Sequence, residues 1–282
     1  MQVDQIKSVS IVVKPDNAEA LVAAHGLSKW LSERDISVAG EPLIASDIST
    51  SSEPVDSDLV VVLGGDGTMI AAARLIGDGE PLVLGINYGS LGYLTDFRFE
   101  EMLPALEAIF AGDCEIDRRV MLDAEHWRDG EMQSSGRVLN DVVINKAALA
   151  RIIEIEVSLN DLAVNTYRAD GLIVATPTGS TAYNLSAGGP IVYPSMNAVV
   201  LTPICPFTLT NRPIVVPDHA TIELKLHDEN EGVVLSLDGQ TGYPMRARDI
   251  IRIRKSSATL NLVQPTNRNY FDVLRDKLKW GR

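Results

Sequence analysis

A glycine-rich turn between an apolar strand and a helix constrains the fold of this chain more than any other segment. Residues 59–63 form a continuous apolar, β-branched run, which is typical of a strand buried on both faces of a sheet. The run Gly-Gly-Asp-Gly-Thr follows at residues 64–68, and residues 68–76 predict an alanine-rich helix that opens with a threonine. This unit offers a phosphate both close backbone approach and the unpaired N–H groups of a helix start. Its one carboxylate, Asp66, is out of place in an anion site, so it indicates a chemical role unless its side chain only closes the turn.

The composition of the chain argues against several classes of partner. Its 282 residues are enough for two modest domains, and contents of 45% hydrophobic and 22% charged residues are ordinary for a soluble globular protein. With 25 basic and 38 acidic residues the net charge is −13, which disfavours nucleic acid and anionic membrane surfaces. An anionic ligand would therefore need local donors or a metal ion to offset the overall field.

No targeting or membrane segment is expected from the sequence. Residues 1–7 lack a basic stretch followed by an apolar one, and no apolar run approaches the roughly 20 residues of a membrane span. Two cysteines do not make a disulfide framework. The four histidines have no His-x-x-x-His spacing, which argues against a transition-metal site built by the protein. We therefore expect a cytoplasmic protein without metal-ligating side chains.

Strands and helices alternate over the first third of the chain. Strands are expected at residues 8–13, 36–38, 59–63 and 81–86, with helices at residues 17–34 and 68–76. This alternation predicts a parallel sheet with helices on both faces. Ligands bind beyond the carboxyl ends of the strands in such sheets. Asp66 and the loop at residues 87–93 both follow strands, so both should lie at that edge.

After a helix expected at residues 99–111, the pattern changes to short β-rich runs separated by turn signals, with one helical segment near residues 182–188. The runs lie at residues 120–126, 138–145, 152–160, 171–175, 198–201, 221–227, 233–237 and 250–254. They predict a mostly β, sandwich-like C-terminal domain built from antiparallel strands.

The last segment is predicted to be helical again and to cross back over the domain boundary. Phe271, Leu274 and Leu278 form one apolar stripe, which should pack on the first domain. We therefore predict an α/β nucleotide-binding domain of residues 1–98 and 266–282, and a β-rich domain of residues 99–265.

Three further segments carry groups suited to binding. Five hydroxyl side chains stand between Thr176 and Tyr183, which favours a polyhydroxylated or phosphorylated ligand over a solvent loop. Asn140 and Asp141 open an apolar strand, where a turn cap is an equal alternative. The run Leu-Asp-Gly-Gln at residues 237–240 predicts only a hairpin.

Together these segments resemble the NAD kinase family, in the same order over about residues 8–280. Residues 64–68, 85–87 with 91–96, 140–141, 170–184, 203–206 and 211–213 are similar to the family's motifs. The glycine turn alone also occurs in phosphofructokinases and lipid kinases, and the hydroxyl-rich segment separates them. The chain departs from the family pattern at Asp141, which replaces a glutamate, at Phe207, where a histidine is expected, and at Tyr88, where arginine or leucine is more usual.

The resemblance implies transfer of a phosphoryl group from ATP to the 2′-hydroxyl of the adenosine ribose of NAD, which gives NADP. Asp66 would be the catalytic residue that accepts the hydroxyl proton, and Mg²⁺ would arrive with ATP. The family also implies a homodimer or homotetramer with the β-rich domains at the interface. A lipid or sugar kinase and a non-catalytic nucleotide sensor are the alternatives, and the sequence does not distinguish ATP from polyphosphate or NAD from NADH.

The resemblance also implies which residues bind the ligands. Asn140 and Asp141 would hold a ribose diol, and residues of the hydroxyl-rich segment would surround the adenosine half of NAD. Arg151, Arg168 and Asp170 would contact the nicotinamide end or the phosphates, in this family often across a subunit boundary. The implied ligand-binding residues are Gly64, Gly65, Asp66, Gly67, Tyr93, Asn140, Asp141, Arg151, Arg168, Asp170, Thr178, Thr181, Ala182, Tyr183, Asn184, Ser186, Cys205 and Gln240.

Overall fold

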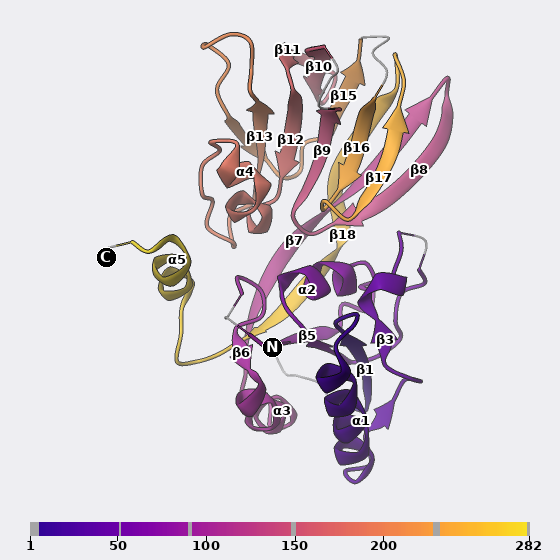
Figure 1. Cartoon of the computed structure of the whole chain (residues 1–282), viewed down its shortest axis with the longest axis vertical. Coiled ribbons are helices and arrows are strands. Elements are labelled where there is room, and N and C mark those ends of the chain that lie inside the picture. The colour runs from indigo at the N-terminus through magenta and orange to yellow at the C-terminus, as the bar shows by residue number, and fades with distance from the viewer. Residues whose placement is uncertain (1–5, 51, 90–91, 148–150, 228–231, 281–282) are drawn as a thin grey trace. The chain divides into compact units, whose positions relative to one another are not determined.

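The computed structural model describes residues 6–50, 52–89, 92–147, 151–227 and 232–280 (Figure 1). Contacts divide the chain into two units. Unit 1 comprises Met1–Arg118 and Leu260–Arg282, and unit 2 comprises Arg119–Thr259. The domain boundaries at residues 98/99 and 265/266 stay a prediction, because a division by contacts does not test which segments fold independently.

Unit 1 is built on the predicted parallel sheet. Its strands are β1 (Ser8–Val13), β2 (Ser37–Val38), β3 (Leu43–Ile44), β4 (Leu59–Leu63), β5 (Leu82–Asn87), β6 (Phe97–Arg98) and the end of β18 (Ile250–Gln264). β1 pairs with β2, β3 and β4, and β5 pairs with β4, β6 and β18, every pair being parallel. The carboxyl ends of β4 and β5 are therefore neighbours, which places the turns that follow them together.

Helices cover both faces of this sheet, as predicted. α1 (Ala18–Ser32) and α3 (Met102–Phe110) share one apolar cluster with alternate residues of β1, β4 and β5. α2 (Asp66–Ala73) lies on the other face (Figure 1), where a Cβ at Gly85 would come 2.7 Å from Met69 Cε. Glycine at this position therefore lets α2 approach β5 closely. Two short 3₁₀ helices, η1 (Ala45–Asp47) and η2 (Phe99–Glu101), complete the connections.

The terminal helix α5 (Tyr270–Leu278) belongs to unit 1, as predicted. Only Leu274 of the predicted apolar stripe is buried, whereas the side chain of Phe271 is 52% exposed. Lys277 of this helix lies with its Nζ 5.9 Å from the ring centroid of Tyr93. No helix in the described residues is long and apolar enough to cross a membrane.

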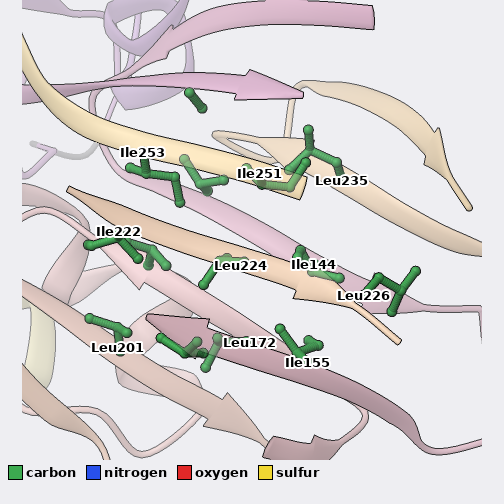
Figure 2. Close-up of a cluster of buried hydrophobic side chains, with 14 of the residues drawn as sticks. Ile144, Ile155, Leu172, Leu201, Ile222, Leu224, Leu226, Leu235, Ile251 and Ile253 are labelled. Atoms are coloured by element: carbon green, nitrogen blue, oxygen red, sulfur yellow. The ribbon is translucent and has the colours of Figure 1, made fainter. Parts of the chain in front are cut away.

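Unit 2 is the predicted β-rich sandwich. One sheet holds β7 (Glu115–Arg128), β8 (Glu131–Val138), β10 (Ile153–Leu159), β11 (Leu162–Ala169), β15 (Ile222–Leu226) and β18. The other has the order β14 (Ile214–Pro217), β13 (Ala198–Ile204), β12 (Gly171–Ala175), β9 (Asp141–Lys146), β16 (Val233–Leu237) and β17 (Thr241–Met245). Figure 2 shows the core between them, where Leu172 and Leu235 of one sheet and Leu224 and Ile251 of the other point into one apolar cluster.

Two segments of unit 2 interrupt its strands. η3 (Thr178–Thr181) and α4 (Tyr183–Ser186) form the short helical segment expected there. The run at residues 138–145, predicted as one strand, is divided, since β8 ends at Val138 and β9 begins at Asp141. The backbone amides of residues 139–141 bind the carboxylate of Asp238, and this interaction replaces strand pairing at the break.

Candidate functional site

The glycine turn of unit 1 presents Asp66 as the first residue of α2, directly after β4. Asp66 Oδ2 accepts a hydrogen bond from the Tyr93 amide at 2.9 Å. Asp66 Oδ1 accepts from the Leu94 amide at 3.0 Å and from the Thr95 hydroxyl at 3.3 Å. The loop after β5 therefore fixes the carboxylate, and the two segments predicted to share the sheet edge do meet there.

A buried hydrogen-bond relay supports this carboxylate from β5. Asn87, the last residue of the strand, donates from Nδ2 to Thr95 Oγ1 at 2.8 Å. Because the Thr95 oxygen accepts this bond, its own proton is directed toward Asp66. Asn87 is 8% exposed and Thr95 is fully buried, so the relay is shielded from water.

Two glycines are required by close approach in this part of unit 1. A Cβ at Gly64 would lie 2.3 Å from Thr68 Oγ1, and one at Gly92 would lie 1.9 Å from Asp66 Oδ1. Among the described residues, nothing lies within 4 Å of the position that a Cβ at Gly65 would take. The turn is therefore closed on the side of Thr68 and the Asp66 carboxylate, and it is open at Gly65.

In unit 2 two of the predicted motifs pack on one another. The turn at residues 139–141 meets the start of the hydroxyl-rich segment, where Thr176 donates from Oγ1 to the Leu139 carbonyl at 2.6 Å and from its amide to the Asn140 carbonyl at 2.9 Å. A Cβ at Gly179 would lie 2.1 Å from the same Asn140 oxygen. The Asn140–Asp141 pair is therefore held directly against the segment that carries most of the other predicted binding residues.

The sequence did not single out Asp238, which the structure places against that same turn. Its carboxylate accepts the amides of Leu139, Asn140 and Asp141 at 2.7–3.0 Å, and its own amide donates to the Asp141 carbonyl at 2.9 Å. An Asp-Gly pair in a hairpin is common for conformational reasons, so nothing in the sequence pattern pointed to this contact.

Asp141 is a buried carboxyl beside a second acidic group. Desolvation by burial, followed by the charge of Asp238, raises the pKa of Asp141 to about 7. Its side chain is 4% exposed in the structure. Asp141 therefore changes its protonation state near neutral pH, unlike an aspartate in water.

Tyr183 lies near three other predicted binding residues. Partial burial raises the pKa of Tyr183, and the nearby Cys205, Asp141 and Asp170 raise it further, so these groups surround the phenol within electrostatic range. Tyr183 keeps 40% of its surface exposed, which leaves a ring face for stacking. Lys146 Nζ lies 3.4 Å from Asp170 Oδ1 and partly balances these acidic groups.

Asn184 is directed into the interior of unit 2. Its side chain is fully buried, with Nδ2 donating to the carbonyls of Ser180 and Pro190 and Oδ1 accepting from Thr202 Oγ1 at 2.6 Å. Thr178 is also buried, and its hydroxyl accepts from Arg119 at 3.3 Å. Thr181 and Ala182 are half-buried, and Ser186 is exposed. Asn184 thus shapes α4, whereas Ser186 is accessible.

The predicted arginines and Gln240 lie at the surface of unit 2. Arg168 forms an ion pair with Glu154 at 3.0 Å, and its guanidinium lies 5.0 Å from the ring centroid of Phe207. Phe207 therefore occupies the expected histidine position as an apolar platform for Arg168. Arg151 and Gln240 are exposed.

Tyr88, the other departure, is in unit 1. Its ring lies 5.1 Å from that of Phe99, and burial, followed by the charge of Glu19, raises its pKa to about 12. Both rings border a cavity of about 660 Å³ between α1 and η2. Within the described residues there is no group of three His, Cys, Asp or Glu side chains that could hold a metal ion.

Comparison with known proteins matches both halves of the chain. Residues 47–114 match the model of the ATP-NAD kinase N-terminal domain, and residues 139–265 match that of the C-terminal domain. The chain is 48% identical to the NAD kinase of Geotalea daltonii and 46% identical to that of Geobacter sulfurreducens, in each case with 98% of this chain and 99% of the relative covered.

Two solved structures share the fold. Yeast NADH kinase complexed with NADH has a TM-score of 0.85 at 25% identity, with 99% of this chain and 89% of that chain covered. An NAD kinase from Archaeoglobus fulgidus in complex with ATP has a TM-score of 0.72 at 25% identity, with 96% and 98% covered.

Proposed function

The chain belongs to the NAD kinase family, and from this premise we propose how its residues phosphorylate NAD. The enzyme transfers a phosphoryl group from ATP to NAD and releases NADP. The proposal for its chemistry rests on one observation, which is the carboxylate of Asp66 held by the loop at residues 93–95.

Asp66 orients the 2′-hydroxyl of the adenosine ribose and accepts its proton. A carboxylate offers about two acceptor positions on each oxygen. Among the described residues Oδ1 accepts two hydrogen bonds and Oδ2 accepts one, so Oδ2 keeps a position for the substrate hydroxyl. Phosphoryl transfer passes through a loose transition state in most analyses, so positioning comes first and the proton moves late.

The glycine turn and the start of α2 bind phosphate groups of the nucleotides. Gly65, at the open side of the turn, lets a phosphate approach the backbone, and the helix start favours negative charge. ATP is highly anionic and the chain carries a net charge of −13, so a divalent cation such as Mg²⁺ accompanies ATP and offsets this repulsion.

NAD is bound by the packed motifs of unit 2. Asn140 and Asp141 hold a ribose diol, and Tyr183 stacks on the adenine, which its half-exposed ring supports. Arg151, Arg168 and Asp170 contact the nicotinamide end or the phosphates. The remaining contacts come from Tyr93, Thr178, Thr181, Ala182, Ser186, Cys205 and Gln240.

We further propose a homodimer or homotetramer that works in the cytoplasm.

An endpoint assay tests this function. The purified protein is incubated with Mg-ATP and NAD, and the product is detected with an NADP-specific dehydrogenase. Diacylglycerol and fructose 6-phosphate are offered as rival acceptors in parallel. The expected result is that the wild type forms NADP and does not phosphorylate the rival acceptors. ATP consumption with a rival acceptor and no NADP would overturn the substrate assignment.

The assay includes two aspartate variants of unit 1. Asp66→Asn should abolish most NADP formation, whereas Asp58→Asn should retain it. Asp58 is a matched control, because its carboxylate also accepts two backbone amides and one hydroxyl, from Lys7 and Ser8, at 2.8–2.9 Å. Equal loss in both variants would make Asp66 a structural residue.

A further inference from the structure

We propose that Asp238 is a positioning residue for NAD, because its carboxylate holds the turn that presents Asn140 and Asp141. This inference rests on the proposed function of those two residues and adds a third residue that does not itself touch the substrate. It assigns the run at residues 237–240 a role that its sequence pattern, a hairpin, does not indicate.

The first support is the convergence of three successive amides on one carboxylate. Asp238 Oδ1 accepts from the amides of Asn140 at 2.7 Å and Asp141 at 3.0 Å, and Oδ2 accepts from that of Leu139 at 3.0 Å. Successive amides that point to one side form a concavity suited to an anion. Here the protein fills this concavity with its own side chain, so the backbone conformation of the turn depends on that carboxylate.

The second support is that the turn lies where strand pairing ends, since Asp141 is the only one of its three residues that pairs in a ladder of the described chain, with Ala175 of β12. β8 ends at Val138 and β9 begins at Asp141, so the turn falls between them. Its carbonyls bind Thr176, and Gly179 packs against the Asn140 carbonyl on that side. The three amides face Asp238 and the carbonyls of Leu139 and Asn140 face the hydroxyl-rich segment, whereas the Asp141 carbonyl accepts from the Asp238 amide. The backbone is thus clamped from two directions by two other predicted motifs.

The third support is that Asp238 is itself held rigidly. It occupies the hairpin between β16 and β17 with a φ of +54°, followed by Gly239 at +64°. The flanking residues Leu237 and Thr241 are paired in the ladder. The loop between them has three residues, 238–240, and its two successive left-handed residues fix the backbone that carries the Asp238 carboxylate. A rigid carboxylate bound to the break between two strands is the arrangement expected of a positioning group.

The substitution series Asp238→Asn and Asp238→Ala tests this role by steady-state kinetics of NADP formation. Asparagine tolerates the left-handed conformation and keeps one acceptor oxygen, whereas alanine removes both oxygens. Because hydrogen bonds to a charged group stabilise more than neutral ones, we expect Asp238→Ala to raise the KM for NAD about tenfold or more. Asp238→Asn should raise it less, and the KM for ATP should stay within about twofold in both variants.

Asp249→Asn is the matched control in the same unit. Asp249 is also a buried carboxylate with several donors, namely His126, Arg128 and the Arg246 amide, and none of these belongs to the turn. This variant should lower the melting temperature without changing the KM for NAD. The contrast separates positioning of the NAD-binding turn from a general loss of stability.

The outcomes distinguish this inference from the proposed function. Absence of NADP formation by the wild type overturns the proposed function and the inference together. NADP formation by the wild type combined with an unchanged KM for NAD in folded Asp238→Ala overturns the inference alone. If Asp238→Ala does not fold, Asp238→Asn decides: a selective rise in the KM for NAD supports the role, and an equal rise for both substrates contradicts it.

Discussion

The two units use the same interaction, a carboxylate bound to backbone amides of a distant segment, for different purposes. In unit 1 the amides of Tyr93 and Leu94 bind Asp66, the carboxylate proposed to act on the substrate. In unit 2 the amides of the 139–141 turn bind Asp238, which supports a neighbour, Asp141. Asp66 and Asp238 are both half-buried, so burial does not distinguish them. The comparison teaches that the same interaction can hold a reacting group in place or shape a turn that binds substrate, depending on what surrounds the carboxylate.

The largest effect is expected from Asp66→Asn, which tests the chemical half of the comparison. Loss of the proton acceptor should lower kcat about a hundredfold or more, while the KM for NAD stays within a few fold. Steady-state kinetics with NAD and ATP varied in turn measures this. A parallel loss of NAD binding and turnover would leave Asp66 with a structural role only.

Two glycine substitutions sharpen the comparison between the units. Gly92→Ala places a methyl group against the Asp66 carboxylate and should lower kcat about tenfold or more, since small displacements of a reacting group are costly. Gly179→Ala places one against the Asn140 carbonyl and should chiefly raise the KM for NAD. Steady-state kinetic constants of both purified variants check this. A raised KM for NAD in Gly92→Ala together with a lowered kcat in Gly179→Ala would contradict the assignment of chemistry to unit 1 and of NAD binding to unit 2.

Gly26→Ala is the control for these substitutions. Gly26 lies inside α1, and no described residue lies within 4 Å of the position that its Cβ would take. Alanine should therefore leave the kinetic constants unchanged and stabilise the helix by about 0.5–1 kcal/mol. A kinetic defect in this variant would mean that glycine substitutions in unit 1 act through general stability.

A smaller effect is expected from Tyr183→Ala. Removal of the half-exposed ring should raise the KM for NAD about three- to tenfold, because an aromatic stacking contact contributes about 0.5–1.5 kcal/mol. The KM for ATP should change less. Measurement of both constants checks the placement of NAD, and a larger effect on ATP would mean that the other nucleotide stacks on Tyr183.

Apart from the kinetic constants, Asp141 is expected to carry a pH dependence of stability. Its pKa is raised in the folded protein to about 7 from an ordinary value near 3.8, so between these values the folded state binds more protons than the unfolded state. The contribution of Asp141 to the free energy of unfolding should therefore fall as pH rises from about 4 to 7. Asp141→Asn should remove this part of the pH dependence in denaturant titrations. An unchanged slope would contradict the raised pKa.

Much of the fold follows from local sequence pattern. The strands at residues 8–13 and 59–63 have the bounds that their β-branched, apolar residues predict. The alternation of strands with α1 and α2 predicts the parallel sheet. The prediction of one strand over residues 138–145 was wrong, because the amides of residues 139–141 bind the carboxylate of Asp238 and the chain leaves strand geometry between β8 and β9. A pattern of neighbours in sequence does not contain a partner 99 residues away.

The candidate site, like the fold, can be predicted from the sequence only in part. Asp66 stands out in the sequence because a carboxylate in a glycine turn conflicts with phosphate binding. Asp238 does not stand out, because an Asp-Gly hairpin satisfies every local rule. The inward orientation of Asn184 likewise depends on Thr202 and Pro190, which the sequence could not place beside it.

Single-turnover phosphoryl transfer, measured against NAD concentration for wild type, Asp66→Asn and Asp238→Ala, tests the central comparison most directly. It separates binding from the chemical step. We predict that Asp66→Asn lowers the rate at saturating NAD with little change in half-saturation, and that Asp238→Ala raises half-saturation with little change in the saturating rate. If both substitutions alter the same parameter, the two carboxylates do not divide chemistry and shape between them.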